Sequence, residues 1–149
     1  MPFSSARNDR MANSCCSTPG ASFATLLLGF ARLALTDYAG ARESFEALVL
    51  AHPTVLHQHM KFRARAIAGL SYIEAHEGNE PGAISLREEL RRMQHFSNIA
   101  LALAYTGAGN HGRATAALDR AFEERDPLCP FVKSDPLFTS YHRELRDAG

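Results

Sequence analysis

Histidine and cysteine are the residues of this 149-residue sequence that could bind a metal or act as a nucleophile. Three of the seven histidines, His52, His57 and His59, lie within one short stretch. No cysteine, aspartate or glutamate accompanies them at the spacing that zinc sites use. On a helix, residues two apart also point in different directions. We interpret these histidines as solvated surface residues and expect no metal site.

The three cysteines form no recognisable chemical motif. Cys15 and Cys16 are adjacent near the N-terminus, whereas Cys129 lies far away beside Pro130. This pattern matches neither a disulfide framework nor a zinc site, and it is typical of a reducing compartment, so we expect a cytoplasmic protein. Cys129 and His142 are a candidate nucleophilic pair, but the apolar neighbours of Cys129 favour a packed turn. We expect no enzyme and no cofactor; the alternative is a helical metal-binding protein or hydrolase.

Charge and hydropathy argue against nucleic-acid and membrane partners. Sixteen basic and sixteen acidic side chains cancel, whereas phosphate backbones attract a basic surplus. Basic clusters at 61–65 and 87–92 have glutamates close by in the sequence and are typical of solvated helix faces. No apolar run reaches the roughly 18 residues that span a bilayer. Arg7 and Arg10 before the apolar run 21–30 imitate a secretory leader, but that run also fits a helix.

Apolar residues recur at helical spacing along most of the chain and predict an all-α fold. Residues 1–20 lack this periodicity and predict a disordered tail, followed by one helical domain over residues 21–148. Asp37, Asn79 and Asn110 are expected N-caps, and Asp135-Pro136 is a further helix start. The expected helices cover 22–35, 38–51, 79–93, 96–107 and 112–125, and a further one begins between 54 and 61 and ends at 76. A loop over 128–133 then leads into a short last helix.

The helices pair into three hairpins that resemble the 34-residue tetratricopeptide (TPR) repeat. The first hairpin matches without a gap at Leu28, Gly29, Ala41, Phe45 and Pro53. The third matches at Leu101, Ala102, Tyr105, Gly109, Ala114, Leu118 and Ala121. The second is weaker, and the spacing of the repeats is irregular. The resemblance implies a right-handed α-α superhelix of about three hairpins with a short C-terminal capping helix; the alternative is a non-repetitive helical bundle.

Residues 95–140 resemble, more specifically, the closing segment of TPR regions in bacterial signalling proteins. The matching residues are Tyr105, Gly109, Leu118, Ala121, Phe122, Asp126, Pro127, Asp135 and Pro136. In that family the TPR region often follows a winged helix, a nucleotide cyclase or a protein kinase domain. Residues of those domains are not found in this sequence, so the resemblance implies only a scaffold role. The alternative function is a residual regulatory or sensory C-terminal module of such a regulator, cyclase or kinase.

The TPR frame places the first helix of each hairpin on a concave face. The residues expected there are Phe23, Leu26, Phe30, Leu33, Arg63, Ala66, Leu70, Ile73, Phe96, Ile99 and Leu103. This mostly apolar set predicts binding of a partner helix or a Leu/Phe-rich peptide in a groove. It lacks the Lys/Asn/Arg set with which chaperone-cofactor TPR domains hold a carboxylate. Alternatively, the last helix, the tail, a second copy in a homodimer, or a neighbouring domain covers these side chains.

Overall fold

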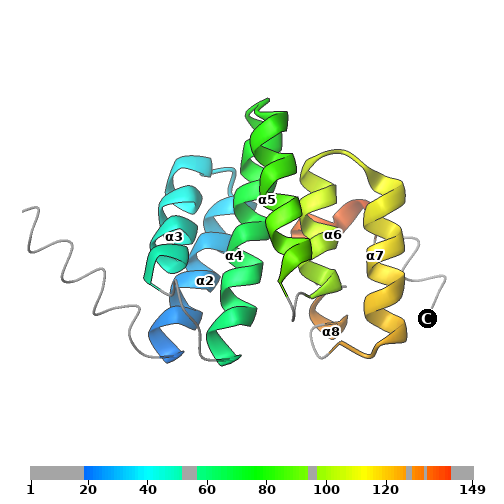
Figure 1. Ribbon diagram of the computed structural model, residues 1–149, viewed down its shortest axis with the longest axis horizontal. Coiled ribbons are helices and arrows are strands. Elements are labelled where there is room, and N and C mark those ends of the chain that lie inside the picture. Colours follow the sequence, from blue (N-terminus) through cyan, green and yellow to red (C-terminus); the bar gives the residue numbers. More distant parts are fainter. Residues whose placement is uncertain (1–18, 52–56, 94–96, 127–128, 133, 142–149) are drawn as a thin grey trace, which may run out of the picture.

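The computed structural model describes residues 19–51, 57–93, 97–126, 129–132 and 134–141 (Figure 1). Every regular element within these ranges is helical, which confirms the predicted all-α class. The elements are α2 (Pro19–Ala34), α3 (Tyr38–Ala51), α4 (His57–His76), α5 (Glu80–Arg92), α6 (Asn98–Gly107), α7 (His111–Glu123), the short α8 (Cys129–Val132) and the 3-10 helix η1 (Pro136–Tyr141).

The helices pair in chain order as α2 with α3, α4 with α5, and α6 with α7. Figure 1 shows the three pairs side by side, with α4 and α5 in the middle. The first helices contact one another in succession, α2 with α4 and α4 with α6. In addition, the second helix of each pair packs on the first helix of the next, α3 on α4 and α5 on α6. Helix α4 is therefore the central element of the described chain.

One turn geometry recurs in all three described hairpins. Each first helix is followed by a residue with positive φ, and an Asp or Asn then caps the second helix. The positive-φ residues are Thr36 (62°), Gly78 (83°) and Gly109 (72°). The capping oxygens of Asp37, Asn79 and Asn110 accept from the backbone N–H three residues on, at 3.1–3.2 Å. These bonds satisfy otherwise unpaired N–H groups, and they confirm the three predicted caps.

The hairpins approach each other closely where glycine faces an aromatic ring. The Phe45 side chain of α3 is fully buried. A Cβ atom added to Gly29 of α2 would lie 2.6 Å from this ring, and one added to Gly69 of α4 would lie 2.5 Å from it. Since both distances are far below van der Waals contact, glycine is required on both sides of the ring.

The C-terminal segment differs from the sequence prediction in two ways. The loop expected over 128–133 contains the helical turn α8, whose Cys129 and Val132 are buried. The expected last helix is the 3-10 helix η1, with a non-helical Phe138 inside it. Asp135 does cap this segment, since its Oδ1 accepts from the Leu137 N–H at 2.9 Å.

Two helix starts also differ from the prediction. Helix α2 begins at Pro19, inside the range expected to be tail, and α6 begins at Asn98 rather than Phe96. Ser97 caps α6 by accepting from the Ile99 N–H at 3.2 Å.

Candidate partner-binding surface

Most residues expected on an open concave face lie inside the packing instead. Seven of them are at most 8% exposed: Leu26, Leu33, Ala66, Leu70, Ile73, Ile99 and Leu103. Phe30 and Arg63 are partly buried, Phe23 is exposed, and Phe96 lies outside the described residues. A partner could contact the seven buried side chains only if the described helices separated, so partner binding at these positions stays a prediction.

The C-terminal segment explains part of this burial. Leu137 of η1 packs against the apolar cluster formed by α2, α3 and α4, and Phe138 is buried in the cluster built mainly by α6 and α7. On the same side, the Arg65 guanidinium lies 5.0 Å from the centre of the Phe30 ring. Burial lowers the pKa of Arg65, while the Asp135 and Asp126 carboxylates oppose that shift. This packing agrees with the alternative that the last helical segment covers part of the expected concave face.

Helix α2 and the residue that follows it carry four of the six large apolar side chains that are exposed among the described residues; the other two are Leu50 on α3 and Ile84 on α5. Its exposed side chains are Phe23, Ala24, Leu27, Leu28, Ala31 and Ala34, all of them apolar. The large ones are 45% (Phe23), 49% (Leu27) and 48% (Leu28) exposed. Leu35 follows directly at 78%, and its N–H still bonds to the Ala31 carbonyl at 3.1 Å. We call residues 23, 24, 27, 28, 31, 34 and 35 the α2 outer face.

The one charged residue within Pro19–Ala34, Arg32, points away from this outer face. Its guanidinium donates to the Gly40 carbonyl at 3.1 Å and to the Ser44 hydroxyl at 3.2 Å, both on α3. A surface helix normally opposes its apolar stripe with polar residues. Since α2 does not, its outer face has the composition of a buried surface.

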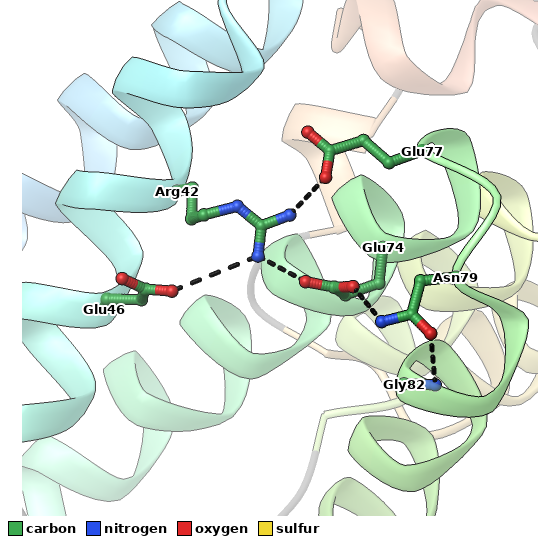
Figure 2. Close-up of polar contacts among 6 residues, drawn as sticks. All are labelled: Arg42, Glu46, Glu74, Glu77, Asn79 and Gly82. Carbon is green, nitrogen blue, oxygen red and sulfur yellow. Dashed lines mark hydrogen bonds and ion pairs between the residues drawn. The ribbon is translucent and has the colours of Figure 1, made fainter.

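A polar network joins the first hairpin to the second (Figure 2). Arg42 of α3 donates to the Glu74 and Glu77 carboxylates near the C-terminal end of α4. Glu74 also accepts from the Asn79 amide at 2.6 Å, and Asn79 caps α5. The bond from Arg42 is the main cause that holds the pKa of Glu74 below its usual value. The network therefore links α3 to the C-terminal end of α4 and to the cap of α5.

Metal and nucleophile chemistry have little support among the described residues. No group of three His, Cys, Asp or Glu side chains in the described ranges lies close enough to hold a metal ion. Cys129 is buried, and burial is the main cause that raises the pKa of its thiol. A raised pKa disfavours the reactive thiolate. His52, His142, Cys15 and Cys16 lie outside the described residues.

Comparisons with known proteins add no assignment, because no family model, curated protein or solved structure matches this chain. Among the described helices, none is both long and apolar enough to cross a membrane.

Proposed function

We propose that the chain is a small TPR-like scaffold that binds protein partners through the α2 outer face. Three features support a repeat architecture: the recurring capped turn, the stacking of each hairpin on the next, and the glycines at close helix approaches. In repeat proteins each unit buries its apolar face on its neighbours, and the terminal units need a polar cap. In the described chain, the first hairpin ends in an apolar surface instead.

The exposed apolar face of α2 is the observation that carries this proposal. Three large side chains on one face are each almost half exposed, and no charged residue interrupts them. Contiguous exposed apolar patches mark interaction sites, whereas scattered single apolar residues do not. The surface fits another helix better than an extended peptide, because helices pack through side-chain ridges at i, i+3 and i+4 spacing.

The spacing on α2 favours a second copy of the chain as the partner. Ala24, Leu28, Ala31 and Leu35 follow the four-three-four spacing of a coiled-coil seam. If two copies of α2 pair antiparallel about a two-fold axis between residues 28 and 31, Leu28 lies opposite Ala31. Leu35 then lies opposite Ala24. Each large side chain therefore meets a small one, which is the complementarity that a symmetric, self-matching interface requires.

A matched pair of charge substitutions tests this proposal. Leu28→Glu places a carboxylate in the centre of the seam, and burying it unpaired costs several kcal/mol. Ile84→Glu is the control, because Ile84 on α5 is 46% exposed, close to the 48% of Leu28. By light scattering, we expect the parent chain and Ile84→Glu to be dimers and Leu28→Glu to be a monomer. If Leu28→Glu kept the mass of the parent dimer, α2 would not be part of the interface.

A further inference from the structure

A second feature lies on the second and third hairpins, where arginines from two helices surround one tyrosine. Tyr105 of α6 is 4% exposed. The guanidinium carbons of Arg87 and Arg91, one turn apart on α5, lie 5.6 and 5.7 Å from the centre of its ring. Arg113 of α7 lies 5.7 Å from the same ring. Each distance is within cation–π range, so three positive charges converge on one side chain.

A pocket of about 180 Å³ opens beside this tyrosine. Leu101 and Tyr105 of α6 and the small side chains of Ala116 and Ala117 line it together with Asn98. Three guanidinium groups complete the lining, those of Arg91, Arg113 and Arg120. Since α6 contacts both α5 and α7, basic side chains reach the pocket from both neighbouring helices.

Acidic partners neutralise only part of this charge. Arg87 pairs with Glu80 at 3.1 Å, and Arg91 pairs with Glu88 at 3.8 Å. Within the described residues, Arg113 and Arg120 have no ion pair.

Two other polar groups affect the electrostatic potential in and beside the pocket. The Nη1 atom of Arg87 is buried without a hydrogen-bond partner among the described residues. The Asn98 amide donates to the Glu124 carboxylate at 2.8 Å, which places one acid at the edge of the pocket. Like charges held together cost free energy, and a bound anion would relieve that cost.

We propose that this pocket, lined by Arg91, Arg113, Arg120 and Tyr105, binds a phosphoryl group. Guanidinium forks match phosphate oxygens in pairs, and a phosphoryl dianion presents enough oxygens for several forks at once. The volume is well below the roughly 300 Å³ at which pockets for drug-sized ligands begin. The pocket therefore suits a group of phosphate size. This site is independent of the α2 outer face, which lies on the first hairpin.

Calorimetric titration of the full chain with inorganic phosphate, at constant ionic strength set by chloride, tests the site. We expect saturable binding that Arg113→Gln weakens by at least about tenfold, the factor that corresponds to losing one charge-assisted hydrogen bond. Arg120→Gln should act in the same direction. Arg92→Gln is the matched control, because Arg92 is exposed on α5 and is not part of the lining. Melting curves should show that all variants fold.

A parallel titration with O-phosphoserine distinguishes the sources of the phosphoryl group. Binding of both compounds supports a site for phosphorylated side chains, and binding of inorganic phosphate alone supports a site for the free ion. The absence of saturable binding by either compound would overturn the proposal. An equal loss in Arg92→Gln and Arg113→Gln would also overturn it, because only general charge attraction would then remain.

Discussion

The ring of Phe45 shows how single residues set the spacing of the hairpins. It is fully buried between Gly29 and Gly69, which come from helices of different hairpins. Each glycine removes a Cβ atom that would overlap the ring. The contact therefore couples the first hairpin to the second through two missing side chains.

Gly69→Ala should destabilise the fold. The new methyl group would lie 2.5 Å from a ring carbon of Phe45, and Gly29 blocks the ring from moving away. Overpacking of this kind costs about 1–3 kcal/mol. The control is Gly112→Ala on α7, where the nearest atom is 4.0 Å away. There, helix propensity predicts a gain of up to about 1 kcal/mol. Equal melting temperatures for the two variants would refute the close contact.

Thr36→Gly should stabilise the first turn. Thr36 is exposed and has a positive φ of 62°. In the other two hairpin turns, glycine occupies this position, at Gly78 and Gly109. The left-handed conformation costs a residue with a Cβ atom about 1–2 kcal/mol, partly offset by the flexibility that glycine adds to the unfolded chain. We expect a higher melting temperature for Thr36→Gly and a lower one for Gly109→Ala. A decrease for Thr36→Gly would contradict the assigned turn geometry.

At the scale of the elements, the Arg42 network predicts a pH-dependent link between α3 and α4. Folding lowers the pKa of Glu74, mainly through its bond from Arg42. The resulting stabilisation is present above the usual glutamate pKa and is lost as the pH falls through the folded-state value. Arg42→Gln should therefore reduce the free energy of unfolding at neutral pH by about 1–2 kcal/mol.

Urea unfolding of the parent chain and Arg42→Gln over a pH series measures this effect. The difference between the two proteins should shrink as the solution becomes acidic and Glu74 is protonated. Arg92→Gln, which removes an equal charge from an exposed position, should show a much smaller difference at neutral pH. If the Arg42→Gln difference were the same in acid as at neutral pH, Glu74 would not be the partner that matters.

Helices and caps were predictable because their signals are local. The Asp37, Asn79 and Asn110 caps follow from residue type and position alone, and the structure contains all three. The burial of Leu70 or Ile99 depends on packing between hairpins and on segments distant in sequence, which periodicity does not report. The same holds for the arginine pocket: Arg91 and Arg113 come from different hairpins, and the sequence showed only solvated basic clusters.

At the scale of the whole molecule, the apolar and the basic surfaces lie on different hairpins, although the chain has no formal net charge. The first hairpin presents the apolar α2 outer face, and the second and third hold the arginine pocket. Helix α4 contacts both α2 and α6 and lies between these two surfaces. If both proposals hold, the two binding surfaces lie on different hairpins of one helical stack.

Sedimentation equilibrium of the full-length chain over a wide concentration range tests the central claim most directly. The account predicts a concentration-dependent shift from the 16.3 kDa monomer to a species of about twice that mass. Leu28→Glu should abolish the shift and Ile84→Glu should leave it unchanged. A parent chain that remains at the monomer mass at every concentration would contradict the claim that α2 pairs with a second copy.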